Sequence, residues 1–337
     1  MYMSPIIMMS SMVMVLSTLM VLTSTNWICL WISMELNMFS FIPIMMSTKN
    51  NLECEASIKY FINQAFASCI MIIMSFMLWG KMSMFYFAAM PLLMVSMMLK
   101  LGSSPCYMWF PSVMKALPWI QSMILATWQK VAPMMILLFN IKPLYFMLMI
   151  ISMMNIFIGG WLGMNQVNIQ SLLAYSSIAH MGWMFMTQAI SMVIVSFTYF
   201  IIYMLILLPV FIMMLKVSMK NFKTINNLTL MPVNIQMCLM LMLLSLAGLP
   251  PLSGFLPKLM ILFTMSTYSL MITLMMVIFS FMSLYFYLNL AFSVMMSLSN
   301  TLNYMILNKP MIMSMVSITI LTPMIILLYA MIMFNKS

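Results

Sequence analysis

The amino-acid sequence predicts an all-α polytopic membrane protein with about eleven transmembrane helices. Of its 337 residues, 66% are hydrophobic and only 5% are charged, and the mean hydropathy is +1.14. A soluble domain has about 25% charged residues, so this sequence cannot build a surface that faces water. Lipid must therefore be the main solvent, and the whole chain, 1–337, is expected to form a single membrane domain.

Apolar segments long enough to cross a bilayer recur along the chain. A helix needs about 20 apolar residues to span the hydrocarbon core. The N-terminal segment is apolar from its first residues, so it is expected to be the first span rather than a cleaved leader. The predicted spans are 4–23, 26–46, 57–79, 83–102, 119–139, 143–163, 171–189, 191–215, 235–263, 268–292 and 311–333.

Two segments are too rich in Pro and Gly to be straight helices. The sequence SSPCYMWFPSVMKALP at 103–118 predicts non-helical backbone with a short half-helix, and GLPPLSG at 248–254 interrupts the apolar segment 235–263. Such backbone is tolerated at membrane depth only where protein or a wet cavity satisfies its polar groups. A lysine adjoins each break, Lys100 before the first and Lys258 after the second, and five spans separate them. This pattern is typical of inverted repeats, in which paired broken helices mark a transport site.

Two charged side chains lie too deep in the predicted spans to reach the membrane surface. Glu35 is about ten residues from either end of its span, or about 15 Å at 1.5 Å per residue. Lys130, in LATWQKVAPMM, is equally deep. A charge at the bilayer centre costs about 2.5–3.5 kcal/mol on insertion scales, and such charges are usually functional. A purely structural Glu–Lys bridge is the competing interpretation.

The charges within the predicted spans cannot all neutralise one another. The chain has three acidic residues and thirteen lysines, and Glu35 is the one acid within a predicted span, against the candidate cations Lys100, Lys130 and Lys258. At least one of these lysines must be hydrated or partly neutral, and a lysine between two protonation states is suited to proton transfer.

The remaining ionisable residues have simpler interpretations. His180, the single histidine, lies mid-span among hydroxyl side chains. It is either a proton relay or a buried histidine hydrogen-bonded to Ser176 or Ser177. Glu53 and Glu55 fall in a predicted polar loop and are expected to be solvated.

The other lysines predict the orientation of the chain. With the spans above, seven lysines lie on the side of the N-terminus (49, 59, 115, 216, 220, 223 and 309) and three on the other side (81, 142 and 336). The N-terminus is therefore expected on the inner, positive side. Because the lysines are scattered, anionic lipid rather than nucleic acid is the expected partner. The sequence has no Gly-rich nucleotide loop, Cys cluster or paired His, so no redox cofactor and no metal are expected in this chain.

Six motifs occur in order along the chain: ELNMFSFIPI (35–44), EASIKYF (55–61), KLGSSP with a following Trp and Pro (100–111), TWQKVAP (127–133), QSLLAYSSIAHMGW (170–183) and LSLAGLPPLSGFLPK (244–258). On these motifs the sequence resembles the chain 2 family of mitochondrial NADH–ubiquinone oxidoreductase, respiratory complex I. The resemblance implies two inverted five-helix repeats, about 4–139 and about 143–292, with broken helices near 100–111 and 248–258 and a last helix at about 311–333. It also implies the mitochondrial inner membrane, with the N-terminus on the matrix side, structural phospholipid, and other membrane-arm and accessory subunits as partners.

The resemblance assigns roles to the buried charges. It implies that Glu35 and Lys100 form a charge pair, that Lys130 is the central relay, and that Lys258 is the lysine of the second broken helix. It places His180 on the polar axis between them. In that family, quinone reduction elsewhere drives proton movement, so NADH, FMN, iron–sulfur clusters and ubiquinone are expected in other subunits.

One position departs from the family pattern. Relatives often have His where this chain has Tyr107, so Tyr107 or water is expected to take part in proton uptake instead. Two other functions compete with that of a proton-translocating subunit. One is a stand-alone cation/proton antiporter, and the other is a structural scaffold whose charges only hold helices together.

Overall fold

The computed structural model describes residues 4–47, 50–79, 83–141, 144–217 and 233–301, and regular structure in these ranges is helical. The chain divides into two compact units, Met1–Ile151 and Ser152–Ser337, with the division inside one helix, α8 (Tyr145–Met164). The predicted repeats, about 4–139 and about 143–292, remain predictions. The predicted last span, 311–333, lies outside the described residues, as do Lys49, Lys81, Lys142, Lys220, Lys223, Lys309 and Lys336.

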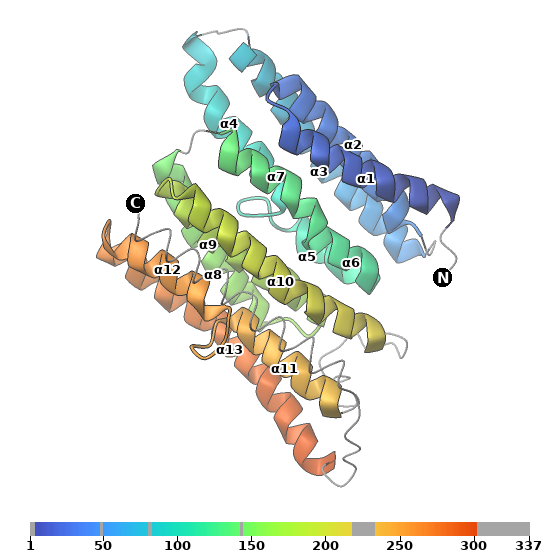
Figure 1. Cartoon of the computed structure of the whole chain (residues 1–337), viewed down its shortest axis with the longest axis vertical. Helices are drawn as coiled ribbons and strands as arrows, with labels where there is room; N and C mark the ends of the chain where they lie inside the picture. Colours follow the sequence, from blue (N-terminus) through green and yellow to red (C-terminus); the bar gives the residue numbers. More distant parts are fainter. Residues whose placement is uncertain (1–3, 48–49, 80–82, 142–143, 218–232, 302–337) are drawn as a thin grey trace. The chain divides into compact units, whose positions relative to one another are not determined.

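The first unit contains seven helices and the beginning of α8 in its described part (Figure 1). α1 packs against α2 and α7, α3 packs against α2, α4 and α5, and α4 also packs against α7. The helices are α1 (Pro5–Thr23), α2 (Trp27–Met45), α3 (Asn51–Trp79), α4 (Ser83–Leu101), α5 (Trp109–Ala116), α6 (Trp119–Ala126), α7 (Trp128–Phe139) and α8 (Tyr145–Met164).

The second unit continues with the rest of α8 and five further helices in its described part. α10 packs against α9, α11 and α12, and α13 packs against α11 and α12. The helices are α9 (Ile169–Ala189), α10 (Val193–Val217), α11 (Val233–Ala247), α12 (Phe255–Ser266) and α13 (Leu270–Thr301).

The predicted apolar spans up to residue 292 are largely helical, and the structure refines three of them. α3 begins at Asn51 and not near 57, so the part of the expected polar loop that contains Glu53 and Glu55 is helical. The predicted span 119–139 is interrupted at Thr127, whose φ of −112° and ψ of −75° separate α6 from α7. The long segment 235–263 is two helices, α11 and α12, as the Gly and Pro residues at 248–254 predicted.

Glu53 is buried, and the expectation that it is solvated was wrong. Its side chain is 1% exposed, in the first turn of α3. Asn50 donates from Nδ2 to Glu53 Oε1 over 3.5 Å, and the Glu53 amide bonds the Asn50 carbonyl. A carboxylate in this position complements the positive end of the helix dipole. Glu55, by contrast, is exposed and pairs with Lys59 one turn further along.

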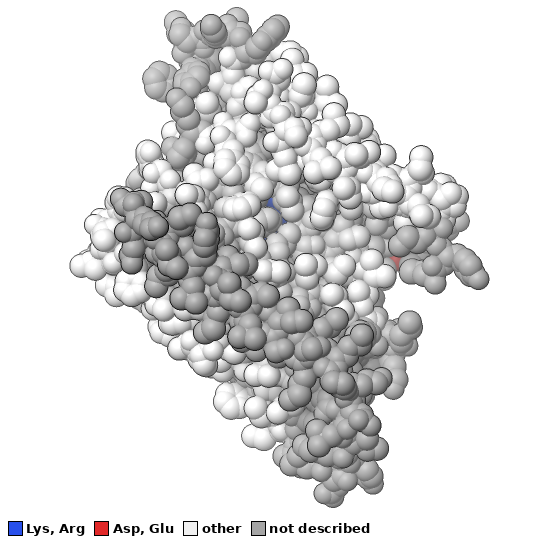
Figure 2. Space-filling model, viewed as in Figure 1, with Lys and Arg blue, Asp and Glu red and all other residues white. Residues whose placement is uncertain are grey.

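The surface of the described residues suits a lipid environment. Seven helices in this part are long and apolar enough to cross a membrane. Among these, α1 presents large exposed apolar side chains along its length, including Ile6, Met9, Met12 and Leu16. On the one face that Figure 2 shows, the described residues are almost entirely uncharged. α9 is different, because nearly all of its side chains are buried, which explains how it accommodates Gln, Ser and His in its sequence.

Both broken helices end in the same backbone motif. Gly102 follows α4 with φ +66°, and Gly248 follows α11 with φ +84°. After α4, the Gly102 amide bonds the Leu99 carbonyl and the Ser103 amide bonds the Met98 carbonyl. After α11, the amides of Gly248 and Leu249 make the corresponding bonds to the preceding turn. This is the Schellman motif, whose left-handed residue is best filled by Gly. The motif stops each helix inside the protein and turns the chain sharply.

Candidate functional site

A polar cavity lies inside the first unit and contains two of the predicted site residues. Its volume is about 20 Å³, counted as the space open to the centre of a water molecule, which is enough for about one water. Lys100 from the last turn of α4 and Lys130 from the first turn of α7 both line it. The other lining residues are Met34, Asn37, Met38, Tyr60, Gln64, Leu101, Trp109, Phe110, Leu125, Gln129 and Pro133.

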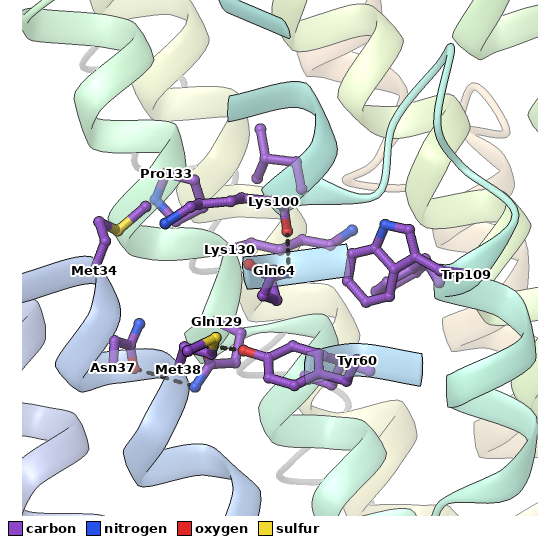
Figure 3. A pocket seen from close by; sticks show the side chains of 13 residues that line it. Met34, Asn37, Met38, Tyr60, Gln64, Lys100, Trp109, Gln129, Lys130 and Pro133 are labelled. Carbon is purple, nitrogen blue, oxygen red and sulfur yellow. Dashed lines mark hydrogen bonds between the residues drawn. The ribbon is translucent and has the colours of Figure 1, made fainter. Parts of the chain in front are cut away.

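The two lysines are almost completely buried. Lys130 is 2% exposed and Lys100 is 7% exposed. Lys130 Nζ lies 4.6 Å from the centroid of the Phe110 ring, which is a cation–π geometry. In Figure 3 the Lys130 side chain extends toward Trp109, and the Lys100 side chain extends toward Met34 of α2. Lys130 is thus enclosed by the protein itself.

Glu35 and Lys100 do not form the direct charge pair that the resemblance implied. In the described part of the chain, the Lys100 ammonium has neither an ion pair nor a hydrogen bond. Glu35 is only partly buried, and it is not one of the residues of α2 that line the cavity. Its carboxylate is close enough to act electrostatically on the Lys100 ammonium and the Tyr60 hydroxyl.

Neutral donors stabilise the broken end of α4. Gln64 Nε2, from α3, donates to the Lys100 carbonyl over 3.1 Å, and Trp109 Nε1 donates to the Leu99 carbonyl over 3.1 Å. The bond from Gln64 gives the Lys100 carbonyl, near the end of α4, a partner from another helix, and the bond from Trp109 adds to the one that the Leu99 carbonyl accepts from the Gly102 amide. The negative end of the α4 dipole also favours the ammonium of Lys100, which lies in the last turn.

A chain of polar side chains crosses three helices beside Lys130. Tyr60 of α3 donates to Gln129 Oε1 of α7 over 3.3 Å, and Gln129 Nε2 donates to Asn37 Oδ1 of α2 over 3.2 Å (Figure 3). Pro133 has no amide hydrogen, so it cannot satisfy the Gln129 carbonyl one turn earlier in α7. The cavity thus has several polar groups next to the Lys130 backbone. Sequence reasoning missed this chain, although an amide side chain in the middle of an apolar span was an available signal.

Replacing Gln129 with Leu is expected to destabilise the first unit. The substitution removes the middle of the polar chain and leaves the Tyr60 hydroxyl and the Asn37 amide buried without this partner. Leaving a buried polar group unsatisfied costs about 1–3 kcal/mol. Thermal unfolding of the purified assembly should show a lower Tm. Gln166→Leu is the control, because Gln166 is only partly buried and bonds the Leu162 carbonyl in the last turn of α8, just before it in sequence. Equal Tm values for the two variants would contradict the prediction.

The second broken helix holds Lys258 in a defined geometry. Lys258 extends from α12 back to the end of α11, where Nζ donates to the Ala247 carbonyl over 2.7 Å. Its ammonium is also 5.9 Å from the centroid of the Trp183 ring. A Cβ atom on Gly248 would lie 2.9 Å from Lys258 Nζ, so Gly at this position also makes room for the lysine. Both Lys100 and Lys258 thus lie at the negative ends of broken helices, although they reach them from opposite sides of the break.

His180 has a hydrogen-bond partner on a neighbouring helix. Its Nδ1 lies 2.8 Å from the hydroxyl of Tyr199 in α10. The Ser176 and Ser177 hydroxyls, the partners considered from sequence, donate to carbonyls of their own helix. His180 and Lys258 both belong to the second unit, and Glu35, Lys100 and Lys130 belong to the first. Tyr107, in the turn before α5, is half-buried and does not line the cavity described above.

Comparisons with known proteins give one consistent result. Residues 24–285 match the family described as NADH:quinone oxidoreductase/Mrp antiporter, TM. NADH-ubiquinone oxidoreductase chain 2 of Lumbricus terrestris is 43% identical over 260 residues, which cover 76% of this chain and 77% of the relative. The protein of the same name from Anopheles gambiae is 39% identical over 249 residues, which cover 72% of each chain.

Solved structures share the fold at low sequence identity. A chain of respiratory complex I from Thermus thermophilus with bound aureothin has a TM-score of 0.81 and 20% identity, and the match covers 96% of this chain and 78% of that one. A chain of the Mrp complex from Dietzia sp. has a TM-score of 0.76 and 14% identity, with 83% and 59% covered. The helices of this chain therefore have a fold that occurs in both kinds of assembly, and the buried lysines lie within that fold.

Proposed function

This chain belongs to the chain 2 family of NADH–ubiquinone oxidoreductase, within the NADH:quinone oxidoreductase/Mrp antiporter family, and on that basis we propose how its buried charges move protons. The protein is a core membrane subunit of the proton-pumping NADH:ubiquinone oxidoreductase of the mitochondrial inner membrane. We place NADH oxidation, FMN, the iron–sulfur clusters and ubiquinone in other subunits. The lysine asymmetry supports an N-terminus on the matrix side.

The observation that carries the proposal is the cavity shared by Lys100 and Lys130. An amine is neutral after it gives up a proton, and it can take up another from water or from a neighbouring group. The cavity has space for a water molecule between polar groups, so a proton can pass between the two lysines without crossing lipid.

Glu35 is the proposed control of this step. Its carboxylate acts on Lys100 without contacting it, so a modest movement of α2 relative to α4 would change the interaction strongly. A closer Glu35 would hold the proton on Lys100, and a more distant one would release it toward Lys130. In the second unit, His180 and Lys258 are the proposed relay groups. Redox chemistry elsewhere in the complex would drive the movement.

Replacing Glu35 with Gln is expected to lower NADH:ubiquinone turnover coupled to proton pumping in each assembled complex. The amide keeps the size of the side chain and removes the charge that acts on Lys100. Turnover should fall several-fold, with the amount of complex on a native gel close to normal. Glu55→Gln is the control, because Glu55 is exposed and pairs only with Lys59 in the described part. A reduced yield of complex with unchanged turnover per complex would instead indicate a structural scaffold.

A stand-alone cation/proton antiporter is the second candidate, since the fold also occurs in an Mrp complex. The two functions differ in what the isolated chain does. The purified chain in lipid vesicles should show no exchange of Na⁺ for H⁺, and in the native membrane it should co-purify with the other membrane-arm subunits. Exchange by the isolated chain would favour the antiporter.

A further inference from the structure

The environment of His180 contains a residue that the mechanism above does not use. His180 lies on α9 and is buried, and α10 presents two tyrosines to it, Tyr199 and Tyr203, each 2% exposed. These tyrosines are four residues apart, so they lie on the same face of α10. Their ring centroids are 6.0 Å and 5.1 Å from that of His180. The imidazole is therefore packed against two phenol rings from one neighbouring helix.

The contact with Tyr199 is a hydrogen bond in addition to packing. The 2.8 Å distance from His180 Nδ1 to the Tyr199 hydroxyl is typical of a well-formed bond. A hydroxyl can both donate and accept, and its hydrogen rotates to suit the partner. When the imidazole is protonated, both ring nitrogens carry a proton and Nδ1 donates to the oxygen of Tyr199. When Nε2 gives up its proton, the neutral ring keeps its proton on Nδ1, and the same bond to the Tyr199 oxygen remains.

This arrangement keeps one side of the imidazole bonded in both protonation states. A side chain without an acceptor atom could not hold Nδ1–H in either state, and a buried polar group without its bond is costly. Because Nδ1 is engaged throughout, Nε2 is the nitrogen at which the proton is exchanged with the rest of the relay.

We propose that Tyr199 is the positioning residue of His180, which holds the imidazole through its hydroxyl in both protonation states and directs proton exchange to Nε2. The inference rests on the proposed relay function of His180. It concerns the second unit and is independent of the roles given to Glu35, Lys100 and Lys130.

The test replaces Tyr199 with Phe, which keeps the ring and removes the hydroxyl. Coupled turnover per assembled complex is expected to fall about fivefold, since a hydrogen bond of ordinary strength corresponds to about that factor. The pH profile of turnover should also shift relative to the unaltered protein. The other titratable side chains facing this region are Tyr203 of α10, Lys258 of α12 and Tyr287 of α13, and they are unchanged in the variant.

Tyr287→Phe is the matched control. Tyr287 is also fully buried in the second unit, but it has no hydrogen bond to His180 among the described residues. It should leave turnover and pH profile close to normal. A second comparison adds Tyr199→Phe to His180→Gln. If Tyr199 acts through His180, then Tyr199→Phe should cause little further loss of turnover in the His180→Gln background.

Three results would overturn the inference. The first is a normal pH profile and normal turnover for Tyr199→Phe. The second is an equal loss of turnover on replacing Tyr199 whether or not His180 is present. The third is failure of Tyr199→Phe to assemble while Tyr287→Phe assembles, which would show that Tyr199 has a purely structural role. Failure of the relay itself has a different signature, because His180→Gln alone would then leave coupled turnover unchanged.

Discussion

Replacing Lys130 with Met is expected to reduce proton-coupled turnover of the assembled complex by at least about a hundredfold. Methionine preserves the length and apolar contacts of the side chain and removes the group that would carry the proton. Positioned acid–base groups contribute about 10²–10⁴ in rate. The Lys130 ammonium is enclosed by the Phe110 ring and the cavity walls, so no exposed group offers an obvious substitute. Coupled NADH:ubiquinone turnover and pumping in reconstituted vesicles measure the effect.

Assembly of this variant should be nearly normal, because an uncharged side chain avoids the cost of a buried amine. Lys59→Met is the matched control. Lys59 is an exposed lysine of the same unit, and it pairs with Glu55. A surface ion pair of this kind contributes only a few tenths of a kcal/mol to stability. Both turnover and yield of the Lys59 variant should therefore be close to normal. Normal pumping by the Lys130 variant would exclude it as the central relay.

Replacing Gly254 with Ala is expected to prevent normal assembly. A Cβ atom at this position would lie 1.8 Å from the Ser245 carbonyl oxygen and 2.9 Å from its carbon. Both are backbone atoms of α11 and cannot move independently, so the start of α12 must shift away. That shift would carry Lys258 away from the Ala247 carbonyl. Forced overpacking of this kind costs about 1–3 kcal/mol and sometimes more.

The amount of assembled complex on a native gel measures this effect, and residual complex should show reduced coupled turnover. Pro251→Ala is the control, since Pro251 is in the same connection and is exposed. Its yield should be close to normal. An equal yield for the two variants would mean that the close approach of the two half-helices does not support the site.

Composition and the spacing of breakers predicted a large part of the fold. Segments of about 20 apolar residues placed the helices because the cost of exposing backbone to lipid leaves few other conformations. Gly102 and Gly248 ended α4 and α11 as expected, because the left-handed backbone after each helix favours Gly. The start of α3 was less predictable, since its first turn is polar in sequence and is held by Asn50 and Glu53.

The candidate site was predicted only in part. Lys130 stood out because a charge far from both ends of an apolar segment needs a reason. The surroundings of Lys130 could not be predicted from the sequence. The side chain of Gln129 bonds two residues that are 69 and 92 positions away along the chain. Whether such residues meet depends on the rotation of each helix about its axis.

The sequence by itself predicted a lipid solvent, where the described helices run, where two of them break, and which charges are far from the ends of their apolar segments. These properties follow from local composition and from the energy of placing polar groups in hydrocarbon. Only the tertiary structure decided which faces are buried: it gave His180 a tyrosine partner, buried Glu53, and left Glu35 and Lys100 without a direct ion pair in the described part of the chain. Lipid tails are as apolar as a protein core, so an apolar helix carries little information about which side it turns inward, and packing between helices makes that choice.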